Sequence, residues 1–129
     1  AAGMCQKKFC LVDSAVDHFI NTCGMKKFFV KFLQGAAEEV IPIFYKKGLQ
    51  IDVVVLDPPR KGCDEKLLNT ILQISPKKIV YVSCDPATMA RDIKTFIQQG
   101  YCLKVVQPVD MFPHTIHVEC VVLMSKVQK

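Results

Sequence analysis

The sequence lacks the signatures of several protein classes, and these absences narrow its possible functions. Its seven cysteines include no Cys-x-x-Cys pair, so a zinc or iron–sulfur cage is not expected. No segment approaches the roughly 18 apolar residues of a membrane span, and the start of the chain has no apolar core of signal-peptide length. The absences predict a soluble, cytoplasmic protein whose thiols are reduced.

Glycine is also scarce, with six in 129 residues, and no G-x-G-x-x-G turn follows a strand-like run. Such a turn normally follows the first strand of a nucleotide-binding α/β sheet. If the fold is of this type, its first strand and Gly-rich loop are missing, so residues 1–129 form part of a single larger domain. A sheet without its first strand exposes unpaired backbone groups, which predicts that the isolated chain self-associates through this edge.

The net charge of the chain excludes few classes of protein. Lysine and arginine number 17 against 12 acidic residues, a net charge of +5. This mild basic bias is compatible with a nucleic-acid partner, but it is also typical of many proteins without one.

Apolar runs alternate with amphipathic segments along the chain. Strands are expected at residues 9–12, 28–35, 51–59, 77–84, 101–112 and 117–127. Helices are expected at residues 15–24, 36–48, 63–75 and 85–100, with a break in the second at Pro42. Continuous apolar strands indicate burial on both faces and hence a mostly parallel sheet. The short connection between the last two strands indicates a hairpin, so one strand near the C-terminus is antiparallel. The pattern predicts a Rossmann-like α/β fold.

Three candidate functional residues are expected at one edge of this sheet. Asp57 and Cys84 follow predicted strands, and the carboxyl ends of such strands are where ligands bind. Glu119 lies early in the final strand, and if that strand is antiparallel its start lies at the same edge.

Each of these candidates also has an alternative interpretation. Cys84 directly precedes a predicted helix, whose N-terminus favours the nucleophilic thiolate, yet a buried inert cysteine is the more common interpretation of a single cysteine at such a position. Asp57 precedes two prolines in a rigid turn, where it either meets a ligand or caps the turn. Arg60 and Lys61 either contact phosphate or are merely solvated.

The segment DMFPHTIHVE gathers acidic residues and histidines, a composition that suggests a metal site. Two of its residues, His117 and Glu119, share one face of a strand. The turn at residues 112–113 separates the other two, Asp110 and His114, from each other, so a metal site is not expected.

Three motifs together resemble the RNA uracil-5-methyltransferases. They are VVVLDPPRKG (53–62), KKIVYVSCDPATMARD (77–92) and PVDMFPHTIHVECVVL (108–123). The resemblance runs from about Ala15 to Val127 and is stronger to the enzymes that act on 23S ribosomal RNA than to those that act on tRNA. It implies a truncated class I methyltransferase domain without the N-terminal RNA-binding barrel of many members.

The resemblance also implies roles for individual residues. S-adenosylmethionine is the cofactor, and Asp57 belongs to the pocket for the cofactor and the target base. Cys84 is the nucleophile that adds to uracil C6, and Glu119 is the general base that removes the C5 proton. Residues expected to hold the RNA are Arg60, Lys61, Arg91 and His114.

Two departures from the family pattern raise alternatives. Typical members have Asn where Asp85 stands, and a carboxylate there opposes ionisation of the neighbouring thiol. The acidic residue that holds the cofactor ribose should fall near Cys10, which is not acidic. The isolated chain is therefore expected to be inactive and to bind S-adenosylmethionine weakly or not at all. One alternative is an inactive RNA-binding or assembly module, and another is an amino-group methyltransferase. The latter is disfavoured because Arg60, and not an aromatic residue, follows the Asp-Pro-Pro turn.

Overall fold

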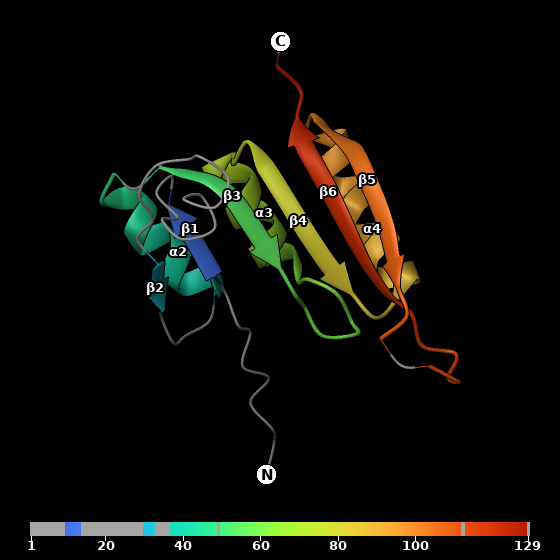
Figure 1. The fold of residues 1–129 in the computed structure, drawn as a ribbon. Helices are drawn as coiled ribbons and strands as arrows, with labels where there is room; N and C mark the ends of the chain where they lie inside the picture. The colour runs from blue at the N-terminus through green and yellow to red at the C-terminus, as the bar shows by residue number, and fades with distance from the viewer. Residues whose placement is uncertain (1–9, 14–29, 33–36, 49, 112, 129) are drawn as a thin grey trace, which may run out of the picture.

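The computed structural model describes residues 10–13, 30–32, 37–48, 50–111 and 113–128. They form a six-stranded sheet in the order β2-β1-β3-β4-β6-β5, with three helices packed against one of its faces (Figure 1). The strands are β1 (Cys10–Asp13), β2 (Val30–Phe32), β3 (Ile51–Leu56), β4 (Lys78–Ser83), β5 (Tyr101–Val109) and β6 (Glu119–Lys126). The helices are α2 (Ala37–Lys46), α3 (Glu65–Ile74) and α4 (Pro86–Gln98).

The core lies between the sheet and the three helices. In β4 the side chains of Ile79, Tyr81 and Ser83 are buried, whereas the residues between them are only half-buried. The same alternation runs through β6 and most of β3. Because successive strand residues point to opposite faces, one face of the sheet packs on the helices. No described helix covers the other face (Figure 1).

The strand pairing confirms the mixed α/β fold but corrects two expectations. The last two strands form the expected hairpin and β6 runs antiparallel to β4, but among the described strands only β3 and β4 pair in parallel. The prediction of a mostly parallel sheet is therefore wrong for this part of the chain. Most side chains on the helix-free face of β3, β4 and β6 are apolar and half-buried, although no described helix covers them. Continuous apolar strands therefore did not indicate helices on both faces, which was the basis for predicting a parallel sheet.

The edge beside β3 is the second correction. It was expected to be unpaired, but β1 pairs with it antiparallel, with Cys10 opposite Val55. The chain's own strand thus satisfies backbone groups that would otherwise be open to another molecule. The unpaired edge was the reason for predicting self-association, and it is not present beside β3. Self-association by another surface remains an untested prediction.

The helices from residue 37 onward follow the sequence closely. Pro86 occupies the first turn of α4, as predicted. Pro42 does not break α2, which is continuous from Ala37 to Lys46 even though a proline there removes one intrahelical hydrogen bond. Burial of Ala37 and Ile41 against the core holds the helix together. The helix expected at residues 15–24 lies outside the described residues. In the described part of the chain, no helix is both long and apolar enough to cross a membrane.

Candidate active site at the carboxyl edge of the sheet

The strand register brings Asp57, Cys84 and Glu119 to one edge of the sheet. Ser83 pairs with Cys120 as the last β4–β6 pair, so Cys84 and Glu119 are the next residues outward on neighbouring strands. Leu56 pairs with Tyr81, so Asp57 leaves β3 at the same edge, where β3 and β4 end in Figure 1. Glu119 adjoins the buried Cys120 within β6, so alternation assigns its side chain to the helix-free face. Asp57 and Cys84 directly follow the last residues of β3 and β4.

The turn between β4 and α4 is fixed around Cys84. The buried Ser83 hydroxyl donates a hydrogen bond to the carbonyl oxygen of Asp85 and accepts one from its N–H, both at 3.0 Å. The Asp85 carboxylate caps α4 by accepting hydrogen bonds from the N–H groups of Ala87 (2.9 Å) and Thr88 (3.2 Å). The half-buried Cys84 thus lies between two anchored residues, one residue before the helix cap.

The loop that leaves β3 is tied to the first turns of α4. The Thr88 hydroxyl donates to the carbonyl oxygen of Arg60 at 2.8 Å. Within the loop, the Gly62 N–H donates to the Pro59 carbonyl at 2.8 Å, and Gly62 has a φ of 78°, which favours glycine. These bonds fix the backbone that follows Asp57, whose own side chain is exposed.

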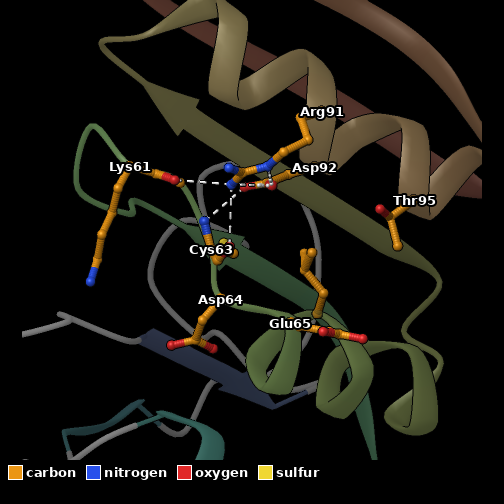
Figure 2. Close-up of a pocket in the computed structure, with 9 residues that line it drawn as sticks. Lys61, Cys63, Asp64, Glu65, Arg91, Asp92 and Thr95 are labelled. Atoms are coloured by element: carbon orange, nitrogen blue, oxygen red, sulfur yellow. Dashed lines mark hydrogen bonds and ion pairs between the residues drawn. The ribbon is translucent and has the colours of Figure 1, made fainter.

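A cluster around the buried Asp92, made of Cys63, Tyr81, Arg91 and Asp92, holds the far end of this loop. Figure 2 shows Cys63, Arg91 and Asp92 of this cluster. The fully buried Asp92 accepts hydrogen bonds through Oδ2 from the Tyr81 hydroxyl (2.6 Å) and the Cys63 N–H (2.7 Å). Its Oδ1 accepts from Arg91 Nε (2.9 Å) and Nη2 (2.8 Å). We call these four residues the Asp92 cluster. It joins the β3–α3 loop, β4 and α4, the three elements that position Asp57 and Cys84.

The Asp92 cluster changes the ionisation of its members. Burial and the hydrogen bond to Asp92 raise the pKa of the Tyr81 hydroxyl far above its ordinary value. The hydrogen bond and the charge of Asp92 raise the pKa of the Arg91 guanidinium. Tyr81 therefore stays protonated as a donor, and both carboxylate oxygens of Asp92 accept hydrogen bonds.

The guanidinium of Arg91, which is predicted to contact RNA, makes intramolecular hydrogen bonds and is still exposed. Besides Asp92, its Nη2 donates to the carbonyl oxygen of Lys61 at 2.9 Å. A cavity of about 380 Å³ lies beside it, lined among others by Lys61, Glu65 and Thr95 (Figure 2). Because Asp57, Cys84 and Glu119 do not line this cavity, it is separate from the edge that carries the candidate catalytic residues.

The segment between β5 and β6 contributes histidines to the same edge. Arg60 Nη2 lies 3.0 Å from His117 Nδ1, and the His117 N–H donates to the Thr115 hydroxyl at 3.3 Å. The exposed His114 has a φ of 64° and contacts none of the candidate catalytic residues in a described hydrogen bond. Among the residues that the structure describes, no three His, Cys, Asp or Glu side chains gather as a metal ion would require.

The residues fit an S-adenosylmethionine site only in part. The exposed Asp57 carboxylate at the carboxyl edge is suited to bind a polar ligand. The sequence, however, contains no Gly-rich turn to complete such a site.

Sequence reasoning missed Asp92, Tyr81 and Thr88. A signal for Asp92 was present in the helix pattern, since it lies at helical spacing among the buried Met89, Ile93 and Phe96. A carboxylate on the apolar face of a helix requires buried donors, and the sequence does not show which residues supply them.

Comparison with known proteins identifies the family. Residues 41–127 match the family model described as tRNA (uracil-5-)-methyltransferase. An uncharacterized RNA methyltransferase of Bacillus cereus (strain ATCC 10987 / NRS 248) is 64% identical over 99 residues, which are 77% of this chain and 22% of the relative. One of Listeria monocytogenes serotype 4b (strain F2365) is 62% identical over 93 residues, 72% of this chain and 20% of the relative.

A solved structure is similar as well. It is the Pyrococcus abyssi tRNA (uracil-54, C5)-methyltransferase in complex with S-adenosyl-L-homocysteine, with 43% identity and a TM-score of 0.53. The match covers 57% of this chain and 18% of that chain. This chain thus spans about a fifth of the length of the curated relatives it matches. On the match over residues 41–127, the chain belongs to the tRNA (uracil-5-)-methyltransferase family.

Proposed function

We propose that this chain is the C-terminal catalytic part of an RNA (uracil-5-)-methyltransferase, which uses S-adenosylmethionine to methylate C5 of a uridine in 23S ribosomal RNA. The observation that supports the proposal most directly is the register of β4 and β6, which places Cys84 beside Glu119 at the carboxyl edge. A nucleophile and a base on adjacent strands can reach the same face of one pyrimidine ring. The preference for 23S ribosomal RNA rests on the sequence motifs, with tRNA as the competing substrate.

Cys84 supplies the nucleophile in this proposal. Uracil C5 is a poor nucleophile by itself, so the Cys84 thiolate first forms a bond from Sγ to C6. The electrons of the C5–C6 double bond move into an enolate, which makes C5 nucleophilic. When bound, S-adenosylmethionine would supply the methyl group that C5 attacks, and the methyl–sulfur bond would break to leave S-adenosylhomocysteine. The position of Cys84 directly before the α4 cap places the thiolate near the positive end of the helix dipole.

Glu119 completes the reaction as the base. It takes the proton from the methylated C5, the electrons of that C–H bond restore the C5–C6 double bond, and the Sγ–C6 bond breaks to release Cys84. Asp57 orients the base and the cofactor from the neighbouring strand. Arg60, Lys61 and His114 contact the RNA, and the target base leaves its stack to reach this edge. The exposed Arg91 also helps to hold the RNA, and its guanidinium fixes the Lys61 backbone beside it.

We further propose that the isolated chain is inactive and binds S-adenosylmethionine weakly. Asp57 is the one residue of this chain assigned to the cofactor pocket, and no Gly-rich turn accompanies it. The cysteines at positions 63, 84, 102 and 120 are free thiols, which supports a cytoplasmic location for the enzyme.

The alternative is an inactive RNA-binding module that retains the fold, and Asp85 is the residue that favours it. The structure weakens this reason, because the Asp85 carboxylate accepts two backbone hydrogen bonds as a helix cap. Asn fills the same capping role, so Asp at this position keeps the turn around Cys84 intact.

The decisive experiment traps the covalent intermediate. A full-length hybrid is made by placing this chain in the Bacillus cereus relative in place of its matching segment, and is mixed with S-adenosylmethionine and RNA containing 5-fluorouracil. Fluorine at C5 cannot leave as a proton, so Glu119 cannot release the adduct, and mass spectrometry should find RNA bound to the peptide that contains Cys84. The adduct should be absent from Cys84→Ala and present in the matched control Cys102→Ala.

Two outcomes would contradict the proposal. An adduct at another cysteine would reject the role of Cys84, and bound RNA without any adduct would favour the binding module. Parallel reactions with 23S ribosomal RNA and tRNA that lack 5-methyluridine identify the substrate, since tritium from labelled S-adenosylmethionine should enter the ribosomal RNA only.

A further inference from the structure

One hydrogen bond connects two loops of the site that are far apart in the sequence. Arg60 follows β3, His117 precedes β6, and their side chains meet at 3.0 Å between Nη2 and Nδ1. The loop after β3 is anchored, because the Thr88 hydroxyl of α4 donates to the Arg60 carbonyl. On the other side, the His117 N–H donates to the Thr115 hydroxyl of its own segment. The bond therefore joins the segment before β6 to an anchored loop.

The strand order shows what this bond spans. Between β3 and β6 lies β4, whose carboxyl end carries Cys84. A contact from the loop after β3 to the segment before β6 must cross the end of β4. Arg60 and His117 thus form a bridge across the edge at which Cys84 and Glu119 lie.

The chemistry of the two groups fixes their roles in the bond. An arginine guanidinium stays protonated in proteins and has no acceptor atom, so it can only donate. Nδ1 of His117 must then be the acceptor, which makes His117 neutral with its proton on Nε2. Arg60 is exposed, and its other N–H groups remain free to donate.

We propose that His117 is a positioning residue that holds the Arg60 guanidinium across the carboxyl end of β4, where its remaining N–H groups bind a phosphate of the target nucleotide. The proposal rests on the proposed function, since it names the part of the RNA that this edge receives. His117 does not touch the reacting atoms in this role. It acts through Arg60, whose planar fork matches a phosphate group.

Protonation of His117 removes the acceptor and places a second positive charge beside Arg60. The other charged or titratable groups on the surrounding segments include Asp57 and Lys61 after β3, Asp85 after β4, Asp110 and His114 after β5, and Glu119 at the start of β6. RNA affinity should therefore change with the ionisation of His117 in a way that a purely structural residue would not produce.

The first test examines the hydrogen bond itself in the 129-residue chain. Side-chain ¹⁵N NMR should show separate Nη signals for Arg60, because the bond to His117 hinders rotation of the guanidinium. His117→Ala should merge them, and His117→Asn, which retains an acceptor oxygen, should keep them apart. Merged signals in the unmodified chain, or no difference on His117→Ala, would overturn the proposal.

The second test measures methyl transfer in the full-length hybrid described above. His117→Ala should raise KM for RNA about three- to ten-fold, the effect of losing one well-placed hydrogen bond, and leave kcat within about two-fold. His117→Asn should restore most of the affinity. In an Arg60→Ala background, His117→Ala should add no further increase, because it acts through Arg60.

The results separate this proposal from the proposed function. A loss of kcat without a change in KM, or a full additional effect in the Arg60→Ala background, would reject the positioning role. If the unmodified hybrid transfers no methyl group, the proposed function fails, and the NMR comparison still decides whether His117 holds Arg60.

Discussion

Asp92 offers the sharpest test of what holds the site together. Asp92→Ala removes the acceptor of two buried donors, the Tyr81 hydroxyl and the Cys63 N–H. Each buried donor left without a partner costs about 1–3 kcal/mol, so the two together predict a loss of about 2–6 kcal/mol. Arg91 adds little to this sum, because its side chain is 58% exposed and water can solvate the freed charge. The free energy of unfolding of a typical domain is about 5–15 kcal/mol, so the substitution should remove a substantial share of the stability of the chain.

Urea denaturation of the chain, followed by circular dichroism, measures this loss. The free energy of unfolding of Asp92→Asn should lie between those of Asp92→Ala and the unmodified chain. Its single amide oxygen can accept hydrogen bonds either from Arg91 or from Tyr81 and Cys63, but not from both sides. Glu65→Ala is the matched control, since it removes an exposed carboxylate beside the same cavity and should cost under about 1 kcal/mol. A cost below about 1 kcal/mol for Asp92→Ala would refute the assignment of Asp92 as the acceptor that holds the loop.

Two further predictions concern the same cluster. Gly62→Ala would bring a Cβ to 2.5 Å from Arg91 Nη2 and 2.6 Å from Asp92 Oδ2, so it should destabilise the chain by at least about 2 kcal/mol. Gly48→Ala is the control, because Gly48 has a similar φ of 82° but an added Cβ would meet nothing within 4 Å. The difference in unfolding free energy between the two variants, measured in urea, therefore isolates the steric cost. Equal losses of stability in both variants would contradict the clash at Gly62. The raised pKa of Tyr81 means that the folded chain keeps a proton which the unfolded chain loses above about pH 10, so stability is fully present below that pH and falls above it. Above about pH 10 the free energy of unfolding should fall by about 1.4 kcal/mol per pH unit relative to that of Tyr81→Phe. If the two chains lost stability in parallel with pH, the raised pKa of Tyr81 would be refuted.

Local sequence patterns were sufficient for the elements that bear the site. Continuous β-branched runs ended by Asp57 and Cys84 predicted β3 and β4, because a buried strand followed by a proline-containing turn has few alternative structures. The short connection before Glu119 predicted the antiparallel β6, and the register then brought the three residues to one edge. Predicting the site required the local strand patterns and the direction of the last strand, and the sequence indicated both.

Long-range partners could not be predicted in the same way. Asp92 and Cys63 lie 29 residues apart, and Arg60 and His117 lie 57 apart. A hydrogen bond over such separations depends on how helices and loops pack, for which single-residue propensities carry no information. The position of β1 against β3 is of the same kind, because any strand with free backbone groups can occupy an open edge. The sequence therefore reveals the reactive side chains more readily than the residues that hold them in place.

Asp85 shows why a departure from a family pattern has to be judged on geometry. On the sequence alone, a carboxylate beside Cys84 counts against a reactive thiolate, because like charges repel. In the structure, Oδ1 of Asp85 accepts the N–H groups of Ala87 and Thr88, and so lies against the positive end of α4. Its backbone is held on both sides by the Ser83 hydroxyl. The same cap that keeps this carboxylate on the helix also fixes the turn from which Cys84 projects. The substitution therefore retains the geometry on which the proposed nucleophile depends.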